Sequence, residues 1–488
     1  MISFSHKIVQ FGFGAVGKSF FEKVSQAISF PEQNYFVITA NQEEFTAFVN
    51  LGGITSNFIV TEITRVNYQE IFGSYLTEGD LLIDFADTVG TRDICEWCIK
   101  EKVMYLNTGE TDWPDNWYSI LKENQRKKDL QKKYAGKISA PIILEHGNNP
   151  GLVSHFVKAG LSYIVKKQFP RNKKMKNYIK KGEWNQLAYA LKLRMVHVND
   201  IDNQEIEEEY TKDKLISTWS PDSFFFEILS EATEILGTHE AIKEPKQFRI
   251  IDNKTGFVEY KEIAFDKKCK TYYPGGWFEG YLVPHEETIT IADTLTIQEK
   301  EEVLYRPTVK FIYRPCNLSR TYLEKSRVNT YPDIDPNKPL DKEEKDCVIT
   351  RGFLYPKETE IVYPEKIRAG TEYVGVLLIG EDFDPVWVGN RVELSYLKKQ
   401  KNSYWQTPTI TPVAMSALAA VCWMIKHPNK GNIYFPDNLP DYQKIIKFAE
   451  KFISKTIYKT FKKEELRTSI SSNNEKLEPA DFFIKEKE

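Results

Sequence analysis

Three glycines near the N-terminus have the spacing of a phosphate-binding loop. Gly12, Gly14 and Gly17 form the pattern G-x-G-x-x-G, which follows a short apolar run and precedes a helical stretch. In such a loop the first glycine permits a tight turn, the second lets a pyrophosphate approach the backbone, and the third lets helix and strand pack closely. Ala15 and Val16 lie within the motif, directly before the helix predicted over 18–27, whose N-terminus would face the phosphates. The motif predicts a dinucleotide cofactor.

The end of the second predicted strand bears on which dinucleotide binds. Residues 35–39 have strand character and end at Thr39, about twenty residues after the glycine motif. The acid that usually holds the ribose 2′-hydroxyl of NAD is missing, because Ala40 and Asn41 follow and the first carboxylate is that of Glu43. No arginine stands there for the 2′-phosphate of NADP. We expect Thr39 to contact the cofactor and NAD to be preferred, although these residues leave NADP open.

Polar side chains follow three further predicted strands, at residues 81–85, 103–107 and 142–145. In an open α/β sheet, ligands bind beyond the carboxyl ends of the strands. A polar turn residue or a helix cap is the alternative for each of these positions. The residues expected around the nicotinamide are Asp84, Thr108, Glu110 and Asn149.

An aromatic residue and a carboxylate in the middle of the chain could hold a cation. Trp219 lies between Thr218 and Ser220, and a cation over the face of a tryptophan gains about 0.5 to 2 kcal/mol. Glu227 lies within the apolar run 224–229, where a carboxylate is unfavourable unless it is paired or bound to a cation. Core packing of Trp219 and a solvent-facing helix position for Glu227 are the alternatives.

His285 and Glu287 are two residues apart, so they share a face if the segment is extended. Ile289, Ile291 and Asp293 continue this spacing and favour a strand. A histidine that is neutral near pH 7 serves as a general acid or base, and Glu287 could bind or orient an amine. A structural histidine is the alternative.

Composition narrows the class of protein. The 488 residues include 66 Lys and Arg against 69 Asp and Glu, a formal charge of −3, so no basic surplus points to nucleic acid. The longest apolar stretch, 410–425, is shorter than the roughly 20 residues that span a bilayer and predicts a buried helix. Six cysteines in so long a chain, without a secretory signal, suit a cytoplasmic protein. Cys95 and Cys98 form a lone C-x-x-C, so we expect helix thiols and no metal site.

The character of the chain changes after Gly151. Residues 152–165 predict an apolar helix, and the block from about 186 to 380 is rich in strand-forming residues and predicts a mixed sheet. Residues 325–346 are charged and contain three prolines, which predicts an exposed loop, and the last dozen residues are expected to be loosely ordered. The fold class is therefore α/β, with a Rossmann-type doubly wound parallel sheet and a large mixed sheet.

Four segments together resemble bacterial homospermidine synthases, relatives of the saccharopine dehydrogenase-like reductases. Their order and spread make the resemblance more specific than the glycine motif alone. The segments are Leu144-Glu145-His146-Gly147-Asn148-Asn149-Pro150-Gly151 with the four residues after it, Thr218-Trp219-Ser220 with Glu227, residues 285–293, and Val374-Gly375-Val376-Leu377-Leu378-Ile379-Gly380.

The resemblance implies an activity and a layout. Enzymes of this family bind NAD, oxidise putrescine to an imine, exchange ammonia for a second putrescine, and reduce the new imine to homospermidine. The layout implied is an NAD-binding Rossmann domain over 1–150, completed by about 381–488, and an inserted α+β substrate-binding and dimerisation domain over 151–380. A homodimer is expected. Spermidine could replace one putrescine.

The resemblance also assigns roles to residues of this chain. Asp202 is a near alternative to Asp200, and Glu110 is the weakest match. The residues expected to be catalytic are Trp219, Glu227, His285, Glu287, Asn149 and Asp200, and those expected to bind substrate are Glu110, Trp219, Glu227 and Glu287.

Two other functions compete with this one. A saccharopine dehydrogenase-type oxidoreductase, with net use of NAD(P)H, would need arginines to bind substrate carboxylates, whereas the candidate residues here are mostly acidic and aromatic. A dinucleotide-binding sensor that lost its chemistry would bind the cofactor without turning over a diamine.

Overall fold

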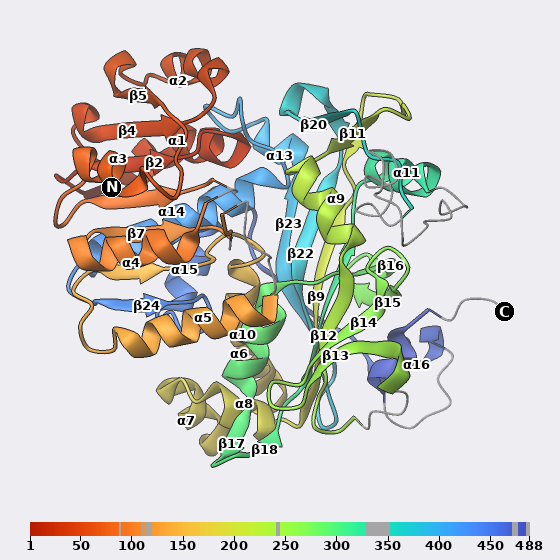
Figure 1. The fold of residues 1–488 in the computed structure, drawn as a ribbon. Helices are drawn as coiled ribbons and strands as arrows, with labels where there is room; N and C mark the ends of the chain where they lie inside the picture. The colour runs from red at the N-terminus through yellow and green to blue at the C-terminus, as the bar shows by residue number, and fades with distance from the viewer. Residues whose placement is uncertain are drawn as a thin grey trace, which may run out of the picture.

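The structure is a computed structural model that describes residues 1–86, 89–109, 111–113, 120–240, 245–327, 352–470 and 477–484. Glu110 and all but the first three residues of the predicted loop at 325–346 lie outside the described residues. Two large sheets dominate the fold. Figure 1 shows the first at one side of the molecule, in red and orange with the blue β24, and the second at the other, in green and cyan.

The first sheet is parallel throughout its described strands. Its order, β24-β8-β7-β6-β2-β4-β5, is that of a doubly wound sheet with one strand added at the edge. The predicted strands at 8–11, 35–39, 81–85, 103–107 and 142–145 are confirmed to within two residues. The bounds are β2 (Ile8–Phe11), β4 (Tyr35–Thr39), β5 (Phe58–Val60), β6 (Leu81–Asp84), β7 (Met104–Asn107), β8 (Pro141–Ile143) and β24 (Asn432–Tyr434).

Helices cover both faces of this sheet, as the predicted fold class requires. The long apolar helix expected at 410–425 is α14, which packs against α1 in the core and leaves most of its residues buried. Cys95 and Cys98 are fully buried in α4, as thiols of a packed helix. The helices are α1 (Ala15–Ala27), α2 (Phe45–Asn50), α3 (Tyr68–Tyr75), α4 (Thr91–Glu101), α5 (Ile120–Lys133), α14 (Ile410–Lys426) and α15 (Tyr442–Ala449).

The second sheet is mixed and has ten strands among the described residues, which confirms the predicted mixed sheet. Its central strand β9 pairs in parallel with β19 and antiparallel with β22. The bounds are β9 (Leu193–Asp202), β12 (Glu231–Ile235), β13 (Phe248–Asp252), β14 (Phe257–Ile263), β15 (Lys268–Tyr273), β16 (Gly276–Leu282), β19 (Thr308–Arg314), β22 (Thr371–Gly380), β23 (Val386–Glu393) and β25 (Ile457–Thr460).

Helices also connect the two sheets. The predicted apolar helix after Gly151 is α6 (Leu152–Gln168), which packs against β22 and β23, and α10 (Glu286–Leu295) packs against β19. In Figure 1 both lie between the two sheets. The other helices are α7 (Lys173–Lys181), α8 (Trp184–Ala190), α9 (Pro221–Leu229), α11 (Asn317–Ser326), α13 (Leu394–Leu397) and α16 (Lys463–Ile470). In the described part of the chain no helix is long and apolar enough to cross a bilayer.

Short two-stranded pairings complete the secondary structure. They join β1 (Ile2–Ser3) to β3 (Ile28–Ser29), β10 (Glu205–Ile206) to β21 (Ile367–Ala369), β11 (Lys214–Ser217) to β20 (Glu358–Ile361), and β17 (Ile297–Glu299) to β18 (Glu302–Tyr305).

The chain after residue 380 contributes to both sheets. Strand β24 belongs to the first sheet and helix α14 packs against its strand β7, whereas β23 and β25 belong to the second sheet. The last described residues also differ from the expected loose tail. Phe482 is fully buried, with its ring centroid 4.6 Å from that of His197 on β9. The segment 477–484 is thus packed against the second sheet, where the Phe482 ring contacts the buried His197 ring.

Candidate active site

The glycine loop has the geometry that the motif predicts. Gly12 has a φ of +86°, and a Cβ there would lie 2.9 Å from the carbonyl carbon of Phe85. A Cβ on Gly17 would lie 2.5 Å from the carbonyl oxygen of Gly12, so helix and strand are in close contact. Gly14 is exposed, and a Cβ there would meet nothing within 4 Å. Open space therefore lies at the N-terminus of α1, where a pyrophosphate would accept hydrogen bonds, and the residues fit a dinucleotide.

A carboxylate that the sequence pattern missed lies at the end of β4. The Thr39 hydroxyl donates to Oε2 of Glu44 at 3.2 Å, and Nζ of Lys18 lies 3.4 Å from Oε1 of the same residue. The Asn41 side chain instead accepts a hydrogen bond from the Glu43 amide. The sequence pattern did not indicate this carboxylate, because only a short 3-10 turn at Gln42–Glu44 brings the Glu44 side chain back toward the end of β4.

The expected nicotinamide end of the site lies at the carboxyl ends of β6 and β7. Asp84 accepts hydrogen bonds from the Ala86 amide at 2.9 Å and the Tyr105 hydroxyl at 2.8 Å, so it shapes the turn that faces Gly12. The Thr108 carbonyl oxygen lies beside Gly147 of the segment that follows β8. Contacts of Asp84 and Thr108 with the cofactor stay predictions.

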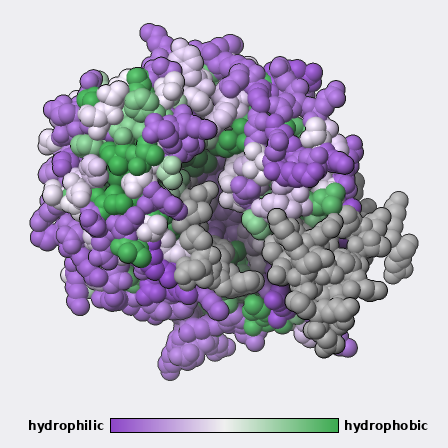
Figure 2. Space-filling model, turned by 45° about the horizontal axis from the view of Figure 1, so that its top comes forward, coloured by the Kyte–Doolittle hydropathy of each residue, from purple (hydrophilic) through white to green (hydrophobic). Residues whose placement is uncertain are grey.

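Asn149 lies in the segment after β8 of the first sheet and forms a hydrogen bond with a residue of the second sheet. Its Nδ2 donates to Oδ2 of Asp200 on β9 at 2.7 Å. Asp200 also lies opposite Tyr313 in the register of β9 and β19. The structure thus brings together three residues that are far apart in sequence, at the junction between the sheets. Figure 2 shows a hollow near the middle of one face of the molecule.

The expectation that residues 285–293 form a strand is wrong, because α10 begins at Glu286. His285 is the N-cap of this helix and has extended backbone angles, φ −153° and ψ 137°. Its Nδ1 nevertheless lies 3.0 Å from Oε2 of Glu287. The two side chains meet because an N-cap side chain folds over the first turn of its helix, so the predicted pair forms on a different element. The His285 ring also stacks on Phe311, with centroids 4.4 Å apart.

The charges around His285 are mostly negative. Burial opposes its protonation, but the carboxylates of Glu287, Glu227 and Glu145 outweigh burial and raise the pKa of His285 to about 9. Burial and the charge of Glu287 raise the pKa of Glu227 to about 7, although His285 opposes this shift. Burial also raises the pKa of Glu286 to about 7. The raised pKa of His285 favours the imidazolium at pH 7, whereas the sequence led us to expect a neutral histidine.

Glu145 brings one more buried charge to this part of the site. Its carboxylate forms an ion pair with Lys127 of α5, and both side chains are almost fully buried. The Glu145 amide is held by Oδ1 of Asn107 at 2.7 Å, at the end of β7. Because Lys127 partners Glu145, the negative charge that acts on His285 comes mainly from Glu287 and Glu227.

Trp219 is held directly before α9, the helix that carries Glu227. Its indole nitrogen donates to the Tyr313 hydroxyl at 3.0 Å, and the ring stays half-buried. Ser220 caps α9 by accepting a hydrogen bond from the Ser223 amide. One hydrogen bond and the start of the helix thus hold the indole against Tyr313, the residue paired with Asp200 in the register of β19 and β9.

Two further carboxylates lie on the same face of the second sheet. Asp202 is two residues beyond Asp200 on β9, and Glu372 of β22 lies directly opposite Asp202. Burial raises the pKa of both, and the charges of Asp200 and Asp202 raise the pKa of Glu372 further. Burial also raises the pKa of Asp200 to about 8, against its hydrogen bond with Asn149. The family resemblance gave Asp202 as a near alternative to Asp200, whereas only strand pairing could find Glu372.

Several carboxylate oxygens in this region have no hydrogen-bond partner among the described residues. They are Oδ1 of Asp200, Oε1 of Glu287 and Oε2 of Glu372. Buried acceptors in native proteins are almost always satisfied, and an unpaired one costs about 1 to 3 kcal/mol. The arrangement is therefore suited to a ligand that brings several N–H donors and positive charge.

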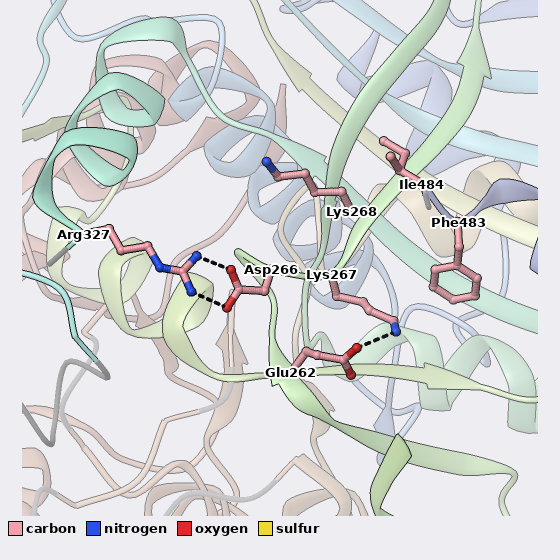
Figure 3. A pocket seen from close by; sticks show the side chains of 7 residues that line it. All are labelled: Glu262, Asp266, Lys267, Lys268, Arg327, Phe483 and Ile484. Atoms are coloured by element: carbon pink, nitrogen blue, oxygen red, sulfur yellow. Dashed lines mark hydrogen bonds and ion pairs between the residues drawn. The ribbon is translucent and has the colours of Figure 1, made fainter. Parts of the chain in front are cut away.

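A surface cavity of about 440 Å³ lies elsewhere on the molecule (Figure 3). Arg327 pairs with Asp266 across it, and Lys267 donates to Glu262 at 3.1 Å. None of its lining residues belongs to the sets described above, and its charges are largely paired with one another, so it is not part of this site. The lining residues are Glu262, Asp266, Lys267, Lys268, Arg327, Phe483 and Ile484.

Comparison with known proteins agrees with this geometry. Residues 8–140 match the family described as the saccharopine dehydrogenase NADP binding domain. The chain is 24% identical over 436 residues to a homospermidine synthase of Mesorhizobium japonicum, across 87% of this chain and 84% of the relative. It is 26% identical over 453 residues to a homospermidine synthase of Blastochloris viridis, across 88% of this chain and 86% of that one.

Solved structures extend the similarity to three dimensions. The homospermidine synthase of Legionella pneumophila, crystallised in complex with NAD, superposes with a TM-score of 0.80 at 25% identity, over 94% of this chain and 92% of that one. Saccharopine dehydrogenase from Saccharomyces cerevisiae shares the fold, with a TM-score of 0.53 at 11% identity over 94% of this chain and 100% of that one. The resemblance inferred from four short segments is thereby confirmed: the chain is similar along nearly its whole length to homospermidine synthases, and its residues 8–140 match the saccharopine dehydrogenase NADP binding domain.

Proposed function

We propose that this protein is an NAD-dependent aminobutyl transferase that makes homospermidine from two molecules of putrescine. The observation that carries the proposal is the set of buried carboxylate oxygens on Asp200, Glu287 and Glu372 that have no hydrogen-bond partner among the described residues, in a chain whose N-terminal loop is shaped for a dinucleotide. A diamine has an ammonium at each end of an apolar chain, so it satisfies such a set of acceptors while its middle contacts aromatic rings.

The reaction balances without an external oxidant. NAD held at the Gly12–Gly17 loop would supply reversible hydride transfer. The amine-bearing carbon of one putrescine would be oxidised to an imine, the second putrescine would displace ammonia from it, and the new imine would be reduced with the same hydride. Two four-carbon diamines thus give one triamine and one ammonia, and the cofactor is regenerated. Only catalytic amounts of NAD are needed.

His285, Glu287 and Glu227 would hold the reacting amine and move its protons. In the empty site His285 is an imidazolium because of the carboxylates around it. A substrate ammonium bound among the same carboxylates would repel the positive charge of His285. Substrate binding would therefore lower the pKa of His285 and favour loss of its proton. The histidine is then neutral and can accept a proton from the amine.

Trp219 and the acids of the second sheet would bind the cationic imine and the far ammonium of the substrate. The half-buried Trp219 ring is held by the Tyr313 hydroxyl, and its face would stabilise a cationic imine. Asp200, Asp202 and Glu372 form a second group of acids that suits the far ammonium. The two groups of carboxylates and the Trp219 ring thus suit a diamine substrate.

Other features of the proposal come from the resemblance to the family. We infer a homodimer in the cytoplasm, and buried cysteine thiols such as those of the described chain suit a reducing compartment. Putrescine is the expected substrate, with spermidine as an alternative donor.

A product analysis tests the proposal against its two competitors. Purified protein receives putrescine and catalytic NAD, and mass spectrometry, an ammonia assay and absorbance at 340 nm follow the reaction. We expect a triamine and ammonia in equal amounts with no build-up of NADH. Continuous NADH accumulation would instead indicate a net oxidoreductase, and NAD binding without any product would indicate a sensor.

A further inference from the structure

The acid that usually binds the ribose of NAD is missing from the end of β4, but a different carboxylate lies there. Glu44 is five residues beyond the strand and is 9% exposed. Its Oε2 accepts a hydrogen bond from the hydroxyl of Thr39, the last residue of β4, at 3.2 Å. The same hydroxyl accepts a hydrogen bond from the Asn41 amide at 3.2 Å. The turn after β4 therefore holds a carboxylate at the edge of the sheet where a ribose lies in dinucleotide-binding domains.

The cation beside this carboxylate is already engaged. Lys18 lies in the first turn of α1, one residue after Gly17, and its Nζ is 3.4 Å from Oε1 of Glu44. The ammonium also lies over the rings of Trp405 and Tyr363, at 4.7 and 5.3 Å from their centroids. The side chains of Lys18 and Glu44 are 7% and 10% exposed. Lys18 is thus shielded on one side by two aromatic rings and on another by Glu44.

We propose that Glu44 selects NAD against NADP in this protein. Its carboxylate, oriented by Thr39, replaces the missing ribose acid, and a 2′-phosphate placed there would meet a negative charge. Lys18 cannot serve that phosphate while it is paired with Glu44. The inference rests on dinucleotide binding by the first domain. It gives the chain a preference opposite to the NADP binding named in the description of the family that residues 8–140 match.

The test is a comparison of binding constants in the absence of any diamine. Isothermal titration calorimetry of the full-length protein gives the Kd for NAD+ and for NADP+, in the original protein and in Glu44→Gln. We expect the original protein to prefer NAD+ by at least about thirtyfold, and Glu44→Gln to reduce this ratio about tenfold or more, because repulsion ends and Lys18 becomes free. Glu43→Gln is the matched control, since it removes the same charge from an exposed neighbour, and its ratio should change by less than about twofold.

Three results would overturn the inference: an original protein that prefers NADP+, an unchanged ratio in Glu44→Gln, or an equal change in Glu43→Gln. If Glu44→Gln does not fold, Thr39→Val keeps the charge but removes the hydroxyl that orients it. We then expect the ratio to fall about threefold, and an unchanged ratio would contradict the proposal. Because the titrations contain no diamine, they succeed or fail independently of homospermidine synthesis.

Discussion

Nδ1 of His285 lies 3.0 Å from Oε2 of Glu287, although the two residues belong to a helix and its cap and not to the expected strand. This contact joins the group with the raised pKa to the carboxylate that contributes most to raising it. The pair therefore governs the protonation of His285 before substrate binds, and the pH dependence of turnover and of folding stability should both reflect it.

The first prediction concerns the pH dependence of turnover. Because the pKa of His285 is raised to about 9, kcat/KM should rise with pH up to about 9 if the neutral imidazole accepts the amine proton. Glu287→Gln should move this rising limb to lower pH by at least about one unit. The pH profiles of both proteins with putrescine give the measurement, and ionisation of the amine itself is common to both. Glu299→Gln, an exposed carboxylate on β17, is the control. An unshifted limb would exclude His285 as the titrating group.

The same pair affects folding stability. A histidine with a pKa raised from about 6.5 to about 9 stabilises the fold fully below pH 6.5, and this contribution is lost as the pH rises toward 9. The ligand-free original protein should lose more stability between pH 6.5 and 9 than His285→Gln does. Urea unfolding at several pH values measures the difference. Parallel pH curves for the two proteins would be evidence against the raised pKa.

Glu372 should destabilise the ligand-free protein but strengthen the binding of putrescine. Burial and two neighbouring acids raise its pKa, so its ionisation destabilises the fold increasingly as the pH rises above about 4. Glu372→Gln should therefore increase the free energy of unfolding at pH 8 by about 1 to 3 kcal/mol and raise KM for putrescine about tenfold. Thermal unfolding without ligand and steady-state kinetics test both effects. Glu358→Gln, exposed on β20, should change neither. A destabilised Glu372→Gln protein would indicate that the carboxylate already has a favourable partner.

Trp219→Ala should impair chemistry without weakening cofactor binding. Loss of a cation–π contact of about 0.5 to 2 kcal/mol lowers kcat about two- to thirtyfold, since the cationic imine forms after NAD has bound. Kinetics and NAD titration measure the two quantities. Tyr313→Phe removes the hydrogen bond that orients the indole and should give a smaller loss. Trp184→Phe on α8 is the control, because that ring packs on Tyr442 away from the site. A weaker NAD affinity in Trp219→Ala would mean that the ring lies at the cofactor.

Gly14→Ala separates cofactor binding from folding. A Cβ at this position meets nothing within 4 Å, so the melting temperature should stay nearly unchanged, yet the methyl group occupies the space through which a pyrophosphate approaches. We expect the Kd for NAD to rise about tenfold or more. Gly73→Ala in α3, where a Cβ also meets nothing, is the control and should bind NAD normally. Normal NAD affinity in Gly14→Ala would contradict the assigned role of the loop.

Much of the first sheet was predictable from local patterns. The strand at 8–11, the glycines that follow it and the helix after them are adjacent in sequence, and each of the five predicted strands is a short, mostly apolar run. Short runs of this kind reveal buried parallel strands because both faces of such strands are covered. The resemblance to homospermidine synthases depended on the same property, since each of its segments is local.

The amino-acid sequence by itself determined the dinucleotide loop, the apolar helices and most residues of the candidate site, because their signals lie within single segments. The tertiary structure decided which of these meet. Glu372 joins Asp202 through the pairing of β22 with β9, Glu44 returns to Thr39 through a turn, and His285 reaches Glu287 as a helix cap. These relationships depend on strand register and on turn and cap geometry, which arise from packing between distant segments and leave no periodic pattern in the sequence.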